Sequence, residues 1–199
     1  MTRGYDPEAA GALCSQCPLR GNKVVPPCGP VTPEMVIVGE APGFQEERKG
    51  VPFIGASGVL LDEMLKANGI KRSDVLLSNS ILCRPVVPEA AGVPDKKRYD
   101  VPTYLAWLRK ENARRSKEAK KNRSGPPVLL TDPFMNCHPR LMKELHWADH
   151  VAKSRGRPNG AVVIALGNKA LEMTTGKVGI MKWRGSPLLP LGSEENEHE

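Results

Sequence analysis

The five cysteines are the residues whose type and spacing point most directly to chemistry. Cys14 and Cys17 form a C-x-x-C pair, whereas Cys28, Cys83 and Cys137 stand alone and far apart. An odd number of cysteines without a secretory signal argues against a disulfide framework. One C-x-x-C pair with two distant single cysteines suits four thiolates that converge on an iron–sulfur cluster or a zinc ion. A redox dithiol, or buried thiols without a shared role, are the alternatives.

Three short apolar runs predict the strands that must position such groups. They cover residues 35–38, 74–77 and 161–166. Continuous β-branched runs of this length are typical of strands that are buried on both faces. Helical patterns follow at 57–67, with an Asn68-Gly69 stop, at 139–151 and at 169–174. Strands that alternate with helices predict an α/β fold, a three-layer α/β/α domain with a central, mainly parallel sheet.

Two loops are expected to form the functional site of this sheet. In a parallel sheet, ligands bind beyond the carboxyl ends of the strands. Residues 39–43 follow the first predicted strand, and residues 78–83 follow the second. The pattern therefore predicts that these two loops lie side by side.

Length and composition exclude several classes of protein. The chain has 199 residues, of which 40% are hydrophobic and 26% are charged. These are ordinary globular values, and they exclude a collagen-like, coiled-coil or wholly disordered chain. The apolar runs are too short to cross a bilayer, and the first ten residues lack an apolar signal core. We therefore expect a soluble cytoplasmic protein that contacts no membrane.

Positive charge is concentrated in one segment. Residues 96–123 hold eleven Lys and Arg against three carboxylates, a net charge of +8, so the rest of the chain sums to −1. A local basic excess predicts a surface for a polyanion, most commonly nucleic acid, with a solvated, partly helical tether as the alternative. Prolines interrupt the α/β pattern here, which predicts a basic insertion at 88–127 with a helix over 104–121. The predicted domain covers 1–192, and an acidic tail covers 193–199.

Several motifs occur in a fixed order along the chain. They are CSQCPL at 14–19, VIVGEAPG at 36–43, GVPFIG at 50–55, NSILCRP at 79–85, CHPRL at 137–141, ALG at 165–167 and RG at 184–185. Together they resemble the family-4 uracil-DNA glycosylases, including the related domains fused to some phage DNA polymerases. The resemblance implies hydrolysis of the N-glycosidic bond of uracil in DNA during base excision repair. It implies a substrate of uracil-containing DNA, single- or double-stranded, and a monomer in a bacterial or phage-infected cell.

The resemblance also implies a 4Fe-4S cluster. Its ligands would be Cys14, Cys17, Cys83 and Cys137. A set with Cys28 in place of Cys137 competes with this one, because the segment between Cys83 and Cys137 is longer than in the family. We prefer Cys137, since a basic insertion lengthens that segment without moving the cysteines in space.

The same resemblance implies which residues meet the base. Catalytic roles fall on Glu40, Glu46 and Asn79, and uracil-binding roles on Glu40, Ala41, Phe53 and Asn79. The Asn79 amide offers a donor and an acceptor to the uracil edge, the Phe53 ring would stack on the base, and backbone N–H groups of residues 40–43 would hold a base oxygen. Either glutamate would orient the attacking water or favour the positively charged sugar. Core packing for Phe53 and an Asx-turn for Asn79 are the alternatives.

We expect the basic insertion at 88–127 to contact DNA phosphates. The expected contacts are basic residues of the stretches 96–98 and 114–123: Lys96, Lys97, Arg98, Arg114, Arg115, Lys120, Lys121 and Arg123.

The C-terminal region departs from the family pattern. Family members carry a His-Pro-Ser-like motif after the Arg-Gly pair, and Ser186-Pro187 stand there instead. His198 precedes Glu199, and His138 adjoins Cys137, so neither matches that motif. Loss of a donor to a leaving group changes rates by about 10² to 10³. The alternatives to an active enzyme are a catalytically weak DNA-binding domain from a larger phage replication protein, and a zinc-stabilised or redox protein.

Overall fold

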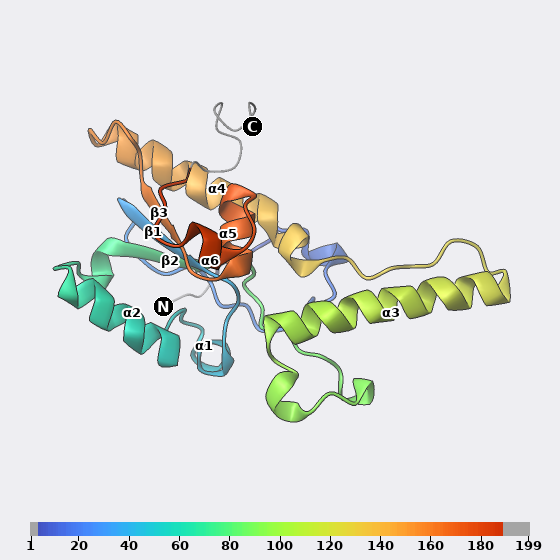
Figure 1. The fold of residues 1–199 in the computed structure, drawn as a ribbon. Coiled ribbons are helices and arrows are strands. Elements are labelled where there is room, and N and C mark those ends of the chain that lie inside the picture. The colour runs from blue at the N-terminus through green and yellow to red at the C-terminus, as the bar shows by residue number, and fades with distance from the viewer. Residues whose placement is uncertain (1–3, 189–199) are drawn as a thin grey trace.

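The computed structural model describes residues 4–188, and a parallel sheet lies at their centre (Figure 1). Strand β1 (Met35–Gly39) runs between β2 (Val75–Asn79) and β3 (Val162–Ala165), in the order β2-β1-β3. Both pairings are parallel, with Val36 opposite Leu76 on one side and Val163 on the other. All three predicted strands are present, so the predicted parallel sheet is confirmed.

Helices cover both faces of this sheet. Helix α2 packs on one face, and α4 and α5 pack on the other. The helices of the described residues are α1 (Phe44–Lys49), α2 (Ala56–Ala67), α3 (Val101–Asn122), α4 (Pro133–Ser154), α5 (Asn168–Thr175) and α6 (Ile180–Trp183). Short 3₁₀ turns occupy Cys14–Gln16, Arg72–Asp74, Glu89–Ala91 and Asp95–Lys97. No helix among the described residues is both long and apolar enough to cross a membrane.

Alternation along β1 divides the core into two layers. Ile37 packs with Leu61 and Leu65 of α2 on one face. Val36 and Val38, which point the other way because successive strand residues alternate, join the layer formed by α4 and α5. The predicted α/β/α architecture is therefore confirmed.

The start of α4 and the presence of α1 differ from the sequence-based expectation. α4 begins at Pro133, six residues before the predicted start at Pro139, and passes through Pro139. Asp132 explains the earlier start, because its side chain accepts a hydrogen bond from the Phe134 N–H and Pro133 takes the favoured first position. The pattern also missed α1, whose six residues are too few to show a period.

The basic segment leaves the sheet after β2. Helix α3 projects away from the body of the molecule, and the chain returns alongside it before α4 begins (Figure 1). The first two turns of α3 are anchored, because Tyr104 and Leu108 are buried in the layer that contains α4. We refer to α3 and residues 123–131 as the arm.

Candidate functional site

Four of the five cysteines line one cavity. Cys14, Cys17, Cys83 and Cys137 surround a space of about 240 Å³ that Leu19, Val24 and Ile81 also line. The first two cysteines come from the N-terminal 3₁₀ turn and its end, the third from the loop after β2, and the fourth from α4. The structure therefore joins three segments that are far apart in sequence. We call this space the thiol cavity.

Burial favours the protonated form of three of these thiols, those of Cys14, Cys17 and Cys83. Burial, with a smaller contribution from the nearby Cys137, raises the pKa of Cys14 to about 11 and that of Cys83 to about 12. The pKa of Cys17 is also raised, mainly by burial. Thiols with raised pKa values ionise readily only when a positive centre stabilises the thiolates.

Cys28 lies elsewhere. It is exposed, and its backbone pairs with Leu77 along the outer edge of β2, with N···O distances of 3.0 and 2.8 Å. It does not line the thiol cavity.

The four thiols line the cavity without converging on a single ion-sized centre. Within residues 4–188, no three His, Cys, Asp or Glu side chains are grouped closely enough to hold a metal ion. A zinc ion requires every sulfur to lie about 2.3 Å from one centre.

A second cavity lies at the carboxyl ends of β1 and β2. It has a volume of about 590 Å³, and both predicted loops contribute to it. Its lining includes every residue expected at the base and in catalysis: Glu40, Ala41, Glu46, Phe53 and Asn79. We call this the strand-end cavity.

Phe53 and Asn79 converge on Gly39, the last residue of β1. A methyl group at Gly39 would lie 2.8 Å from Phe53 Cζ and closer still to Asn79 Oδ1, so only glycine admits both side chains. Phe53 also packs in the α2 core layer and is 8% exposed. Its ring therefore both fills the core and lines the cavity.

Arg72 fixes the backbone of Phe53. Phe53 has φ 54°, a left-handed conformation that is costly for an aromatic residue. The Arg72 guanidinium donates to the carbonyls of Phe53 and Pro52 at 2.8 and 2.9 Å, and it also pairs with Asp62 at 2.6 Å. No sequence pattern predicted this role of Arg72, because an arginine that donates to main-chain carbonyls leaves no pattern.

The two carboxylates of the cavity have different partners. Glu46 is buried, and its Oε1 accepts hydrogen bonds from the N–H groups of Ile54 and Gly55 at 3.1 and 2.7 Å. Glu40 is half-buried, and its Oε1 accepts one hydrogen bond from the Lys169 N–H at 2.9 Å. Glu46 thus holds the loop that carries Phe53, whereas Glu40 links the end of β1 to the start of α5.

A buried arginine fixes the end of β2. Arg140 of α4 is fully buried, and its Nη2 donates to the carbonyls of Asn79 and Ser80 at 2.7 and 3.0 Å. Its Nη1 pairs with Glu144 at 2.8 Å. The Glu144 carboxylate accepts further hydrogen bonds from Ser78 and Tyr5. This network ties the backbone of Asn79 to the helix that carries Cys137.

No histidine lines the strand-end cavity among the described residues. His138 Nε2 lies 3.1 Å from the Met173 carbonyl, at the interface of α4 and α5. His146 and His150 are exposed on α4. His198 and the acidic tail lie outside the described residues.

Three of the predicted DNA contacts bond within the protein. Arg98 is buried, donates to the Val87 carbonyl and pairs with Glu89 and Asp95. Arg114 pairs with Glu111 and Glu118, and Arg115 pairs with Glu111. The other predicted contacts are exposed cations without an ion pair in the described chain: Lys96, Lys97, Lys120, Lys121 and Arg123.

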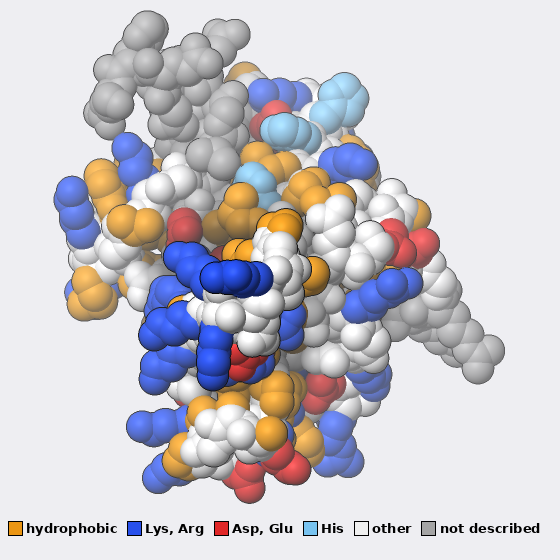
Figure 2. Space-filling model, turned by 90° about the vertical axis from the view of Figure 1, so that its right-hand side faces the viewer, with side chains coloured by type: hydrophobic (Ala, Val, Ile, Leu, Met, Phe, Trp, Pro, Cys, Tyr) orange, Lys and Arg blue, Asp and Glu red, His pale blue; other side chains and the backbone are white. Residues whose placement is uncertain are grey.

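Five cations gather on one face of α3. At 3.6 residues per turn, they fall within about a third of the helix circumference and extend about 18 Å along its axis. They are Arg109, Lys110, Lys117, Lys120 and Lys121, all of which are exposed. Figure 2, in which the free end of α3 points at the reader, shows Lys and Arg side chains gathered around it. We call this face the α3 stripe.

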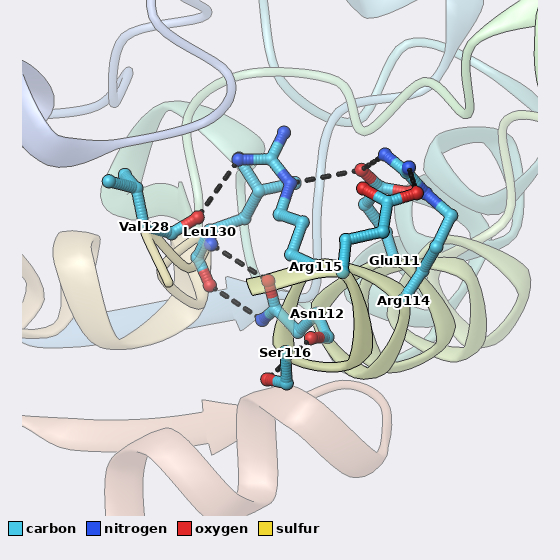
Figure 3. Close-up of polar contacts among 8 residues, drawn as sticks. Glu111, Asn112, Arg114, Arg115, Ser116, Val128 and Leu130 are labelled. Carbon is cyan, nitrogen blue, oxygen red and sulfur yellow. Dashed lines mark hydrogen bonds and ion pairs between the residues drawn. The ribbon is translucent and has the colours of Figure 1, made fainter. Parts of the chain in front are cut away.

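Side chains of α3 hold the returning chain (Figure 3). The Asn112 amide accepts from the Leu130 N–H at 2.8 Å and donates to the Leu130 carbonyl at 2.9 Å. Arg115 donates to the Val128 carbonyl at 3.0 Å. Hydrogen bonds from Arg114 and Arg115 lower the pKa of Glu111 to about 2, so this carboxylate is ionised at neutral pH. The arm is thus a helix whose side chains hydrogen-bond to the extended segment that returns beside it.

Comparisons with known proteins agree with this geometry. The model of the uracil DNA glycosylase superfamily matches residues 26–194. A type-4 uracil-DNA glycosylase of Archaeoglobus fulgidus is 49% identical over 74 residues, which cover 36% of this chain and 37% of that protein. The type-4 enzyme of Thermotoga maritima is 45% identical over 74 residues, with coverage of 36% and 38%. The matched stretch thus spans little more than a third of either relative.

Proposed function

Because the chain belongs to the uracil-DNA glycosylase superfamily, we propose that it excises uracil from DNA by hydrolysing the N-glycosidic bond. The observation that carries the proposal is the convergence of Phe53 and Asn79 at Gly39, in a cavity that Glu40 and Glu46 also line. An enzyme that acts on a base must extrude it, stack it and hydrogen-bond its Watson–Crick edge. An aromatic ring beside a side-chain amide supplies both kinds of contact.

Asn79 and Phe53 would bind the extruded uracil. The Asn79 amide would accept from uracil N3–H and donate to O4, while the Phe53 ring would stack on the base. The N–H groups of Ala41 and Gly43, which donate to no acceptor within the described residues, would hold a uracil oxygen as negative charge develops on the base.

Glu40 would orient the water or favour the positively charged sugar. It is the half-exposed carboxylate at the strand end, whereas buried Glu46 uses Oε1 to hold two N–H groups of the Phe53 loop. We therefore assign Glu46 to positioning Phe53. This division of roles refines the sequence-based prediction, in which either glutamate could take the catalytic role.

The residues of the thiol cavity fit a 4Fe-4S cluster. Four cysteine thiolates are the usual ligands of such a cluster, and the four cysteines line one cavity together with the apolar side chains of Leu19, Val24 and Ile81. The proposed ligands are Cys14, Cys17, Cys83 and Cys137. When bound, the cluster would cross-link three segments of the chain, one of which continues to Arg140 and the end of β2.

The α3 stripe is the proposed contact with DNA phosphates. Exposed cations attract the DNA backbone without reading its sequence. Lys120 and Lys121 were expected from the sequence, and the geometry adds Arg109, Lys110 and Lys117 to the proposal. Lys96, Lys97 and Arg123 remain further proposed contacts.

A second candidate function is DNA binding with little or no catalysis. The specific observation in its favour is that no described histidine lines the strand-end cavity. For either function we propose a monomer that acts in the cytoplasm, where free thiols such as the five of this chain stay reduced.

Single-turnover excision tests the proposed function. The protein, purified without oxygen, is mixed in excess with a uracil-containing oligonucleotide, and base release is followed. We expect excision by the native protein and a rate about 10² to 10³ times lower for Asn79→Ala, because that variant loses contacts to the developing uracil anion. Asn159→Ala, which removes an exposed amide far along the chain, should leave the rate unchanged.

Two results would count against an enzyme. Tight, strongly salt-dependent DNA binding by a native protein that releases no uracil would establish the second candidate. Equal rates for the native protein and Asn79→Ala would remove Asn79 from the uracil contacts.

A further inference from the structure

Two aromatic rings at the rim of the strand-end cavity share one guanidinium. Phe44, the first residue of α1, lines the cavity and is 55% exposed. Tyr99, just before the N-cap of α3, is 37% exposed. Arg84 Cζ lies 5.3 Å from the Phe44 ring centroid and 3.8 Å from that of Tyr99. The segment that leads into the arm therefore meets the rim of the cavity at this point.

Arg84 is a fixed support for the two rings. Its side chain is 11% exposed, and its Nη1 lies 3.2 Å from Glu47 Oε2. Its carbonyl accepts a hydrogen bond from the Asn22 amide at 3.1 Å. A guanidinium held in this way orients the rings through cation–π contacts before any ligand binds.

Core packing does not account for Phe44. The ring belongs to neither core layer, and more than half of its surface meets water although it is among the largest apolar side chains. Arg48 Cζ lies 5.6 Å from the same ring, and exposed Lys96 and Lys97 come shortly before Tyr99. Exposed rings among cations are the combination that binds single-stranded nucleic acid, because bases stack on the rings and phosphates pair with the cations.

We propose that Phe44 and Tyr99 stack the unpaired bases next to the extruded nucleotide, and that the protein thereby prefers single-stranded DNA. This inference rests on the proposed DNA substrate but not on catalysis. The two rings lie between the strand-end cavity and the start of the arm, so a strand that leaves the cavity would cross them before it reaches the α3 stripe.

The test measures binding of DNA that contains no uracil. Fluorescence anisotropy gives the Kd of a short oligothymidylate for the native protein, Phe44→Leu and Tyr99→Leu over a range of salt concentrations. Each variant should bind about five- to a hundredfold more weakly, because one base loses the aromatic side chain on which it stacks. The dependence of Kd on salt should not change, since no cation is removed. Trp147→Leu, which removes an exposed ring of α4, should bind like the native protein.

Two further measurements separate stacking from structural support. Phe44→Tyr and Tyr99→Phe, which keep a ring, should bind normally. A strand with the bases removed should bind the native protein and both leucine variants equally. The proposal fails if the leucine variants bind oligothymidylate normally, if they lose as much affinity for the strand without bases, or if duplex binding weakens equally. A native protein that stacks bases but releases no uracil would refute the proposed enzyme and leave this site standing.

Discussion

Residues of the strand-end cavity are held in place by hydrogen bonds from other elements, whereas the cations of the α3 stripe are exposed to solvent. Arg72 holds the backbone of Phe53, and Arg140 holds that of Asn79. Lys117, Lys120 and Lys121 have no ion pair within the described chain. Hydrogen bonds to a base edge require fixed positions, whereas attraction to phosphates requires only charge near the strand. The difference shows why net charge alone overestimates the number of cations available to DNA, since several arginines here hold the fold together.

The largest expected effect concerns the thiol cavity, where three segments of the chain meet. Cys137→Ser should lose most of the bound iron and its visible absorbance, and should unfold at a lower temperature, because a cluster ligand also stabilises the fold. Iron analysis, absorbance and thermal unfolding measure this. Cys28→Ser is the matched control and should keep its iron, because Cys28 lies outside the cavity. The reverse result would make Cys28 the fourth ligand.

The next effect concerns Arg140. Arg140→Met leaves the Glu144 carboxylate without its cation, and breaking a buried pair in this way costs about 3–5 kcal/mol of unfolding free energy. Urea unfolding measures the loss. Lys153→Met breaks the exposed pair with Asp149, also on α4, and should cost no more than about 1 kcal/mol. Equal losses for the two variants would show that the end of β2 does not depend on Arg140.

The smallest effect concerns the arm. Replacing Lys117, Lys120 and Lys121 together with Gln should leave the stability unchanged. It should lower the slope of log K against log salt for duplex binding by about 2.7, since each phosphate contact contributes about 0.9. Replacing the exposed Lys66, Lys71 and Lys143 with Gln makes the same change in charge elsewhere. If both triple variants have the same slope, the protein's overall charge, and not the α3 stripe, sets its attraction to DNA.

The sequence predicted the fold where patterns were long enough to read. The apolar runs at 35–38 and 161–166 located strands of the sheet, and the loops after β1 and β2 both reached the cavity. The short helix α1 and the capped start of α4 were missed, because one depends on few residues and the other on a local cap.

The arginines that support the site were the least predictable part. Arg140 and Glu144 lie one turn apart, close to the apolar face of α4 formed by Cys137, Leu141 and Leu145. A pair of opposite charges beside a buried face was the available signal for Arg140. Nothing comparable marked Arg72, since its partners are main-chain carbonyls whose position depends on the fold.

The fastened return of the arm bears on how fast the protein folds. Cys83 must meet Cys137 across the whole arm, and closing a flexible loop costs about 0.6 kcal/mol more for each doubling of its length. Helix α3 has contacts close in sequence, which form faster than pairings of distant segments. Hydrogen bonds from Asn112 and Arg115 to the returning segment bring the two ends of the arm together. The contact between Cys83 and Cys137 should therefore form faster than the length of the intervening segment suggests.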